Sequence, residues 1–211
     1  LSSLYKMSAE EFKANIKGEG TLMAGAKWTG VWTRDISYSI LLSLAIVAPD
    51  ACKTSLMAKV KDGMIIQDTG TGGSWPVSSD RIVWALAAYE VYLSTGDEGW
   101  LKDSYDIIKR SIEADEITVI DPLTGLFRGE TSFLDWREQT YPRWMEPADI
   151  YNSCALGTNV VFARSYQILA EMEKLLGIPG GQYAQKAENV KTAINTTLWD
   201  SKNKRYSSFI Y

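Results

Sequence analysis

The sequence contains no histidine, and this absence excludes several kinds of active site at once. Catalytic Ser-His-Asp and Cys-His groups need an imidazole, and so do histidine-based zinc sites. Carboxylates must therefore carry out any proton transfer at neutral pH, with Tyr or Lys as helpers. We predict no metal and no other cofactor for this chain.

Positive charge and cysteine are also scarce. The formal net charge is −4, and no block rich in lysine and arginine interrupts the 211 residues. Nucleic acid, whose phosphate backbone requires a basic face, is therefore not an expected partner. The two cysteines, Cys52 and Cys154, show neither the paired spacing of a metal site nor that of a disulfide framework. We expect both to be small buried side chains, with a disulfide as the alternative.

Long apolar runs are missing as well. The best of them, residues 40–49, is too short to cross a bilayer and contains Ser43, so no membrane span is predicted. What the chain does have is 45% hydrophobic residues. That content is ample for the core of one large globular domain, or of a substantial part of a bigger one.

Helical patterns of two kinds alternate along the chain. Some segments are apolar or small on nearly every side and are expected to be buried all round: residues 36–48, 80–95 and 156–170. Others carry charges on one face and apolar residues on the other, and are expected to lie outside: residues 8–16, 50–62, 97–115 and 180–198. Asp97 after Gly96 marks one of the helix starts independently of periodicity.

This alternation predicts an all-α fold of the α/α toroid type, in which a ring of buried helices is enclosed by a ring of half-exposed ones. The pattern provides about three and a half helical hairpins. We therefore expect residues 1–211 to form a single, incomplete toroid. A smaller irregular all-α domain is the alternative, although it would leave the buried-looking helices short of neighbours.

Strand patterns are minor. Residues 117–129 predict a short β-hairpin around the turn at 121–125, inserted before residue 130. Residues 205–211 predict either a further strand or a loop.

Charged and aromatic residues gather just upstream of each apolar helix, within residues 28–35, 72–81 and 130–151. Inner helices of a toroid run parallel because an outer helix runs back between them, so these three helix starts should meet at one mouth. Asp35 and Asp80 suit this place because helix N-termini favour negative charge. We expect a cleft there that is walled by four tryptophans, namely Trp32, Trp75, Trp136 and Trp144. Core packing is the alternative for each tryptophan taken alone.

Residues 30–39, Gly-Val-Trp-Thr-Arg-Asp-Ile-Ser-Tyr-Ser, resemble the Trp-Thr-Arg-Asp signature of glucoamylases and their bacterial six-hairpin relatives. In that family the arginine and aspartate hold hydroxyls of the sugar that is cleaved. The resemblance implies that Arg34 and Asp35 bind substrate, with Trp32 as a wall of the subsite. A plain N-terminal cap is the alternative for an Arg-Asp pair.

Residues 74–81, Ser-Trp-Pro-Val-Ser-Ser-Asp-Arg, are similar to the second loop of the same family, where a paired Arg and Asp again precede an apolar helix. The similarity implies that Trp75, Asp80 and Arg81 contact sugar. In order and spacing the resemblance covers most of the chain. It implies a six-hairpin glycosidase with a carbohydrate substrate.

Residues 129–144 combine three carboxylates, two arginines and four aromatic rings, a composition that suits cleavage of a glycosidic bond. A proton donor needs a raised pKa, and Asp135 lies between two apolar neighbours that would raise it. Glu138 follows an arginine, which would keep it ionised. We therefore assign Asp135 as the general acid and Glu138 as the second candidate.

The resemblance bears on this assignment in two ways. The Asp-Trp step at 135–136 is similar to one in sugar phosphorylases and other relatives, where the aspartate is the proton donor. Glucoamylases instead use a glutamate after a tryptophan at about this place. The rest of the segment is assigned to sugar contacts: Glu130, Trp136, Arg137 and Trp144. For Glu130 and Glu146 a structural role is equally open, and a surface loop with solvated charges is the alternative for the whole segment.

Together these features predict an inverting glycoside hydrolase that acts on an α-linked glucan or a related oligosaccharide. In inverting relatives the base comes from a late inner helix. We therefore expect it beyond residue 211, in a remainder of the domain against which this chain packs. A toroidal sugar phosphorylase or polysaccharide lyase, the latter using Tyr141 with Arg143, stays open. So does a non-catalytic carbohydrate-binding module.

Overall fold

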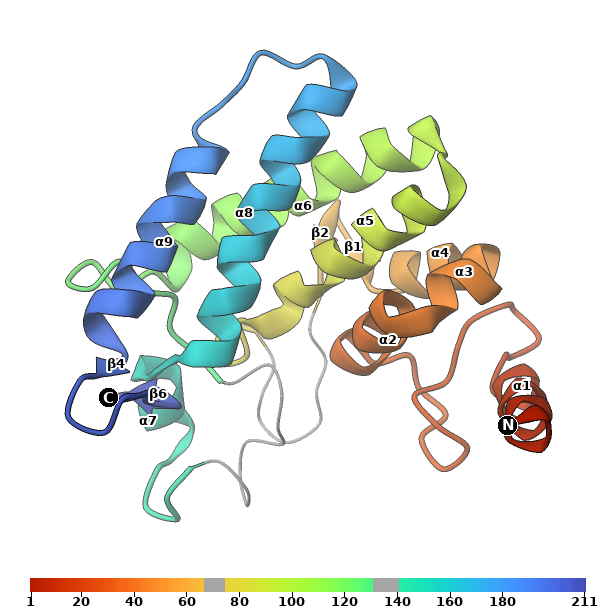
Figure 1. The fold of residues 1–211 in the computed structure, drawn as a ribbon, viewed down its shortest axis with the longest axis horizontal. Helices are drawn as coiled ribbons and strands as arrows, with labels where there is room; N and C mark the ends of the chain where they lie inside the picture. The colour runs from red at the N-terminus through yellow and green to blue at the C-terminus, as the bar shows by residue number, and fades with distance from the viewer. Residues whose placement is uncertain (67–74, 131–140) are drawn as a thin grey trace.

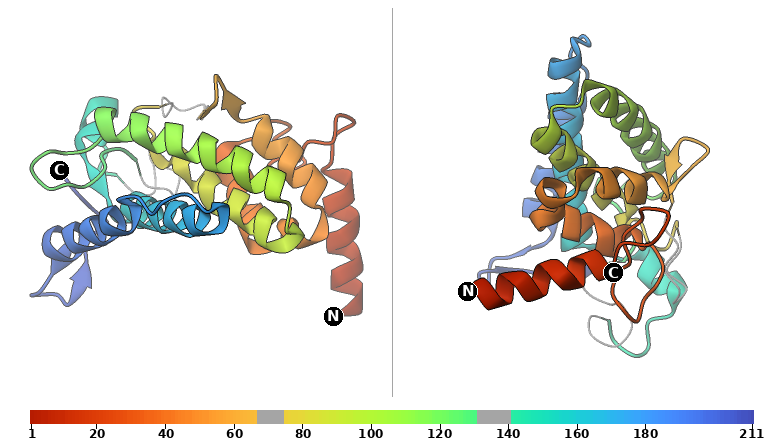
Figure 2. Two further views of the ribbon diagram at one scale, coloured as in Figure 1. Left: turned by 90° about the horizontal axis from the view of Figure 1, so that it is seen from above. Right: turned by 90° about the vertical axis from the view of Figure 1, so that its right-hand side faces the viewer.

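The computed structural model describes residues 1–66, 75–130 and 141–211, and most of them are helical (Figure 1). The first helix, α1 (Ser2–Ala14), projects from one end of the molecule and has no buried residue (Figure 2). The remaining long helices form two layers.

The inner layer holds the apolar helices. They are α2 (Thr33–Ser39), continued by a π-helical turn (Ile40–Leu44) and by α3 (Ala45–Val47); α5 (Trp84–Thr95), preceded by a 3-10 turn (Asp80–Val83); and α8 (Leu156–Leu176). The outer layer holds the amphipathic helices α4 (Pro49–Met57), α6 (Glu98–Thr118) and α9 (Tyr183–Thr197).

The packing follows the order of the chain. Helix α5 contacts α2 and α8 in its own layer and α4 and α6 in the outer layer, while α9 packs along α8. The three inner helices all begin on the lower side of the molecule as drawn in Figure 1. The alternation of outer and inner helices expected from the sequence is therefore present, and the prediction of an all-α toroid-type fold is confirmed.

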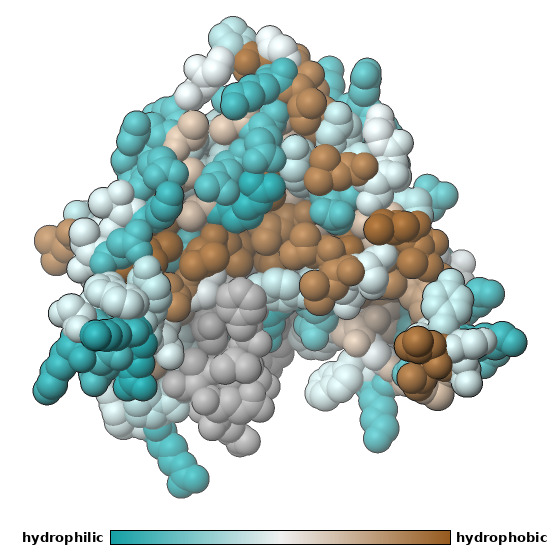
Figure 3. Space-filling model, in the orientation of Figure 1, coloured by the Kyte–Doolittle hydropathy of each residue, from teal (hydrophilic) through white to brown (hydrophobic). Residues whose placement is uncertain are grey.

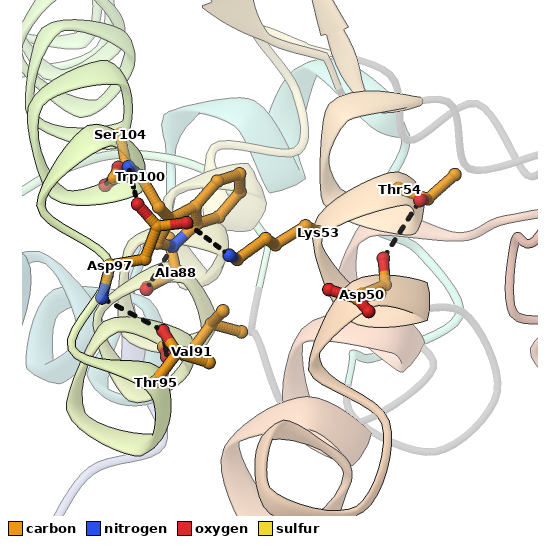
Figure 4. Close-up of polar contacts among 9 residues, drawn as sticks. All are labelled: Asp50, Lys53, Thr54, Ala88, Val91, Thr95, Asp97, Trp100 and Ser104. Carbon is orange, nitrogen blue, oxygen red and sulfur yellow. Dashed lines mark hydrogen bonds and ion pairs between the residues drawn. The ribbon is translucent and has the colours of Figure 1, made fainter.

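The turn between α5 and α6 illustrates how local sequence sets a boundary (Figure 4). Gly96 ends α5 with a positive φ of 67°, which suits a residue without Cβ. Asp97 then caps α6 by accepting a hydrogen bond from Trp100 N at 3.0 Å. Lys53 of α4 reaches the same carboxylate at 2.6 Å, and Trp100 Nε1 donates to Ala88 O at 2.8 Å. These contacts hold α4, α5 and α6 together at one end.

Buried aromatic rings hold α8 against the loop that follows α6 and hold α5 against α4. Phe127 and Phe162 stack with their centroids 3.6 Å apart. Trp84 is fully buried, and its Nε1 donates to Leu56 O at 2.9 Å. Rings of this size bury more apolar area than any other side chain, so they dominate the energetics of the core.

The strands are short and pair antiparallel. The pairs are β1 (Val60–Lys61) with β2 (Met64–Ile65), β3 (Cys154–Ala155) with β6 (Phe209–Ile210), and β4 (Trp199–Asp200) with β5 (Arg205–Tyr206). The strand expected within 205–211 is thus confirmed. The β-hairpin expected over 117–129 is present only in part. Its first residues are wrong, because α6 continues to Thr118. The turn at 121–125 is present, closed by hydrogen bonds from Asp121 N to Leu126 O and from Arg128 N to Val119 O around an isolated bridge between Ile120 and Phe127. A further short helix, α7 (Pro147–Asn152), was not expected.

The two cysteines are free and buried, as predicted. Burial raises the pKa of the Cys52 thiol to about 12 and that of Cys154 to about 11. Both thiols therefore stay protonated and unreactive at neutral pH. Within the described part of the chain, no helix is long and apolar enough to cross a membrane.

One expectation about the inner helices is wrong. Residues 36–48 are not buried all round, because Leu42, Ile46 and Val47 are 80%, 76% and 63% exposed. Exposed apolar side chains continue on the other inner helices with Leu93 of α5 and Val160 of α8. Figure 3 shows apolar side chains gathered in a band over α3, α5 and α8. We call these five residues the open face; a patch of this kind marks an interaction surface.

Candidate active site

The first predicted cluster lies at the start of α2. Trp32 immediately precedes the helix and is half-buried, and the next residue, Thr33, donates its hydroxyl to Ile66 O at 2.7 Å. Arg34 and Asp35 occupy the first turn, the former half-buried and the latter exposed. The Asp35 carboxylate therefore lies where the helix dipole favours negative charge, and it remains open to solvent and to ligand.

The second predicted cluster turns toward the outer layer. Arg81 Nη2 lies 2.9 Å from Asp115 Oδ1 of α6, and Trp75 Nε1 donates to the same oxygen at 2.7 Å. The Arg81 guanidinium also stacks on the Trp75 ring, 4.6 Å from its centroid, and donates to Ile65 O at 2.7 Å. Arg81 is only 4% exposed. In this arrangement Trp75 and Arg81 hold the second loop against α6, and the sugar contacts assigned to them stay predictions.

Asp115 is a residue that the sequence patterns did not single out. It is fully buried, and this burial raises the pKa of its carboxyl from 3.8 to about 6, against the opposing influence of Arg81. A signal was present: Ser111 and Asp115 stand one helical turn apart on the apolar face of α6, where Ser111 accepts from Arg81 through its carbonyl at 3.3 Å. A charge on the buried stripe of an amphipathic helix indicates a partner from another element.

The backbone of Asp80, the remaining residue of the second cluster, begins the 3-10 turn that leads into α5. Its predicted contact with sugar stays a prediction.

The third predicted cluster begins with Glu130, which is fully buried. Ser78 Oγ donates to Glu130 Oε1, and Ser79 Oγ donates to Arg128 O at 2.5 Å. Glu130 N donates to Val77 O at 3.1 Å. We call this set of hydrogen bonds between residues 77–79 and residues 128–130 the clasp. It joins the second and third clusters directly.

Gly129 makes the clasp sterically possible. Its φ is +117°, and a Cβ at this position would lie 2.5 Å from Ser79 Oγ and 2.7 Å from Val77 O. Only glycine fits such a backbone conformation at such a close approach.

The starts of the inner helices therefore converge, as the toroid argument predicted. The 3-10 turn Asp80–Val83 contacts both α2 and α8. Two successive backbone carbonyls link the first two clusters. Ile65 O, at the end of β2, accepts a hydrogen bond from Arg81, and Ile66 O accepts one from Thr33. The clasp links the second to the third. Three segments that are far apart in sequence thus form one end of the molecule.

The last part of the third cluster packs on the C-terminal residues. Trp144 is 61% exposed, and its ring centroid lies 5.6 Å from that of Tyr211. Tyr211 Oη donates to Asp149 Oδ1 at 2.6 Å, which lowers the pKa of that carboxyl. Glu146 forms a capping box with Asp149 at the start of α7, so Glu146 has a structural role here. Exposure keeps Trp144 available for stacking on a ligand.

The two proposed catalytic carboxylates, Asp135 and Glu138, lie outside the described residues, as do Trp136 and Arg137. Their roles stay predictions. Across residues 1–66, 75–130 and 141–211, no group of three or more histidine, cysteine or carboxylate side chains is arranged to hold a metal ion.

Comparison with known protein families identifies the family of this chain. No curated protein sequence matches it. The family described as the bacterial alpha-L-rhamnosidase 6 hairpin glycosidase domain matches residues 51–209, which include most of α4, all of α5 through α9, and the second and third clusters. The particular similarity to glucoamylases is not shown by this match. The chain belongs to this family of bacterial six-hairpin glycosidase domains and is thus a glycoside hydrolase.

Proposed function

We propose that this chain contributes the sugar-binding wall and the proton donor of an inverting glycoside hydrolase. The observation that carries the proposal is the convergence of three helix starts bearing Trp, Arg and carboxylate side chains at one end of a six-hairpin glycosidase domain. Exposed Asp35 and Trp144 offer a hydrogen-bonding group and a stacking surface to a pyranose. Arg34 and Trp32 stand beside Asp35 and would bind the same sugar.

In this proposal Asp135 protonates the glycosidic oxygen as the bond to the anomeric carbon breaks. A second carboxylate takes a proton from water, and the water oxygen bonds to the anomeric carbon from the opposite face. Glu138 is the alternative donor. The Asp-Trp step and the apolar neighbours of Asp135 in sequence favour Asp135.

We further propose that the base belongs to additional helical hairpins of the same domain. The support is the open face, whose five exposed apolar side chains stand on three successive inner helices. Covering it with further inner helices would bury those side chains and would bring a late carboxylate to the same mouth.

Two substrate classes follow from two different observations. The Trp-Thr-Arg-Asp segment favours an α-linked glucan or a related oligosaccharide. The name of the family favours an α-L-rhamnoside. Nitrophenyl α-D-glucoside and nitrophenyl α-L-rhamnoside, offered to the complete protein in phosphate-free buffer, separate these classes. The buffer also separates two reactions: cleavage without phosphate indicates hydrolysis, whereas cleavage that requires added phosphate indicates phosphorolysis.

The decisive experiment is Asp135→Asn in the complete protein. Loss of the general acid should lower kcat about 10²- to 10⁴-fold on an unactivated substrate while sugar binding persists. Asp106→Asn, an exposed aspartate on α6, is the matched control and should leave kcat unchanged. Unchanged hydrolysis by Asp135→Asn would overturn the assignment. Retention of anomeric configuration in the first product, followed by NMR, would overturn the inverting mechanism.

A further inference from the structure

The structure points to a role for Glu130 other than the sugar contact implied by its place in the carboxylate-rich segment. We propose that Glu130, held by Ser78, is a positioning residue for the proton donor. The proposal rests on the function proposed above, because it assumes that Asp135 is that donor.

The side chain of Glu130 is closed to solvent. It is 0% exposed, and Ser78, which donates to its Oε1, is also fully buried. Ser78 stands in the loop before α5, so the carboxylate is directed at a neighbouring loop of the protein. A sugar contact would require an accessible polar atom. A buried carboxylate that receives a hydroxyl from another element instead fixes the relative position of the two elements.

The backbone of Glu130 is held from both sides. Its N–H donates to Val77 O at 3.1 Å, and its carbonyl accepts from Thr158 Oγ1 in the first turn of α8. The preceding residue, Gly129, donates to Ser153 O at 2.8 Å. The chain therefore leaves residue 130 from a point fixed against both the second loop and the third inner helix.

This point is close to the proposed donor along the chain. Asp135 follows Glu130 by five residues, a span of about 18 Å at most when fully extended. The position of this anchor therefore limits where the donor can lie. Misplacement of a catalytic group by about 1 Å costs on the order of 100-fold in rate. The clasp is thus suited to set the geometry of proton transfer without touching the substrate.

Leaving-group dependence tests this role. Glu130→Ala and Ser78→Ala would be compared with wild type on an alkyl glycoside, whose leaving oxygen needs a proton, and on the glycosyl fluoride of the same sugar. Fluoride leaves as a weakly basic anion as the C–F bond breaks, so it depends much less on the general acid. Glu188→Ala, an exposed glutamate on α9, is the matched control.

Both clasp variants should lower kcat for the alkyl glycoside about 10- to 100-fold, with KM changed by less than about 3-fold and the fluoride rate nearly preserved. An equal loss on both substrates with a raised KM would show a direct sugar contact and overturn the proposal. Unchanged kinetics would overturn it as well. Ser78→Ala removes one hydroxyl and leaves the carboxylate in place, so it keeps the test open if Glu130→Ala fails to fold.

Asp135→Asn, measured with the same two substrates, separates this proposal from the one on which it rests. If Asp135→Asn loses the alkyl glycoside and keeps the fluoride while the clasp variants do not, Asp135 is the donor and Glu130 does not position it. If Asp135→Asn shows no such selectivity, the donor assignment itself fails.

Discussion

The inner helices have two sides that differ in how deeply their side chains are buried. On the side facing the outer layer, Trp84 and Ala88 of α5 are completely buried and are hydrogen-bonded to Leu56 of α4 and Trp100 of α6. On the open face, Leu42 and Ile46 are mostly exposed. Apolar side chains stand on both sides, so hydrophobicity alone does not cause the difference. The presence or absence of a neighbouring helix does.

Ion pairs show the same contrast. Arg81 and Asp115, between the start of α5 and α6, lie 2.9 Å apart with side chains only 5% and 0% exposed. Arg164 and Glu171 on α8, next to Val160 of the open face, lie 2.8 Å apart with both side chains 40% exposed. Nearly equal distances therefore imply different energies, because solvent screens the second pair and not the first.

The largest expected effect comes from Arg81→Met. Removing the guanidinium leaves Asp115 buried without its cation, so we expect a loss of about 3–5 kcal/mol of unfolding free energy at pH 7. The loss should shrink at lower pH, where Asp115 can take up a proton. Arg164→Met, which breaks the exposed ion pair beside the open face, is the matched control and should cost about 0–1 kcal/mol. Chemical denaturation of both variants measures the difference, and equal losses would contradict it.

A similar contrast is expected for leucine. Leu56 of α4 is 1% exposed, and Leu56→Ala should cost about 2–5 kcal/mol because it removes buried methyl groups and leaves a cavity. Leu42→Ala, at 80% exposure, should change the stability of this chain by less than about 0.5 kcal/mol. Thermal or urea unfolding of the two variants would measure this, and a large loss at Leu42 would show that the open face is covered.

A pH dependence of stability is expected from Asp115, which is buried between α6 and the second loop. The folded pKa of Asp115 is raised to about 6 from 3.8, so the folded state binds more protons than the unfolded state between these values. Its contribution to stability is therefore complete below about pH 4 and is lost as pH rises through about 6, by about 3 kcal/mol. Urea unfolding across this range should show a slope that Asp115→Asn removes. A slope unchanged by that substitution would assign it to other groups.

The helix pattern was predictable because it depends on local chemistry. Periodicity separated apolar from amphipathic segments, and Asp97 marked the start of α6. The start of the hairpin expected at 117–129 was predicted wrongly, since α6 runs on to Thr118 and overrides the β-branched residues there. The exposure of Leu42 could not be predicted either, because an apolar residue does not specify which element covers it.

The sequence predicted that the polar clusters lie at the starts of the inner helices. It did not predict the hydrogen-bonding partners of the residues in those clusters. Trp, Arg and Asp stand in the sequence just before three apolar helices, and parallel inner helices of a toroid place those three helix starts close together. Whether Arg81 faces a cleft or Asp115 depends on the register of α6 against the second loop, which no local pattern encodes. The same holds for Glu130, whose partner Ser78 lies 52 residues earlier in the chain.

The smallest effect on stability, and the most direct test of the open face, is expected from Leu42→Ser combined with Ile46→Ser. In this chain alone both side chains are exposed, so unfolding free energy should change by less than about 1 kcal/mol while self-association falls. In the complete protein, where we propose that further inner helices cover this face, the same substitutions should cost several kcal/mol by placing two hydroxyls in a core. Comparing the two proteins by calorimetry and sedimentation distinguishes these cases. Equal, small effects in both would mean that the open face stays exposed in the complete protein. The inner helices would then be buried on one side and exposed on the other in the complete protein as well.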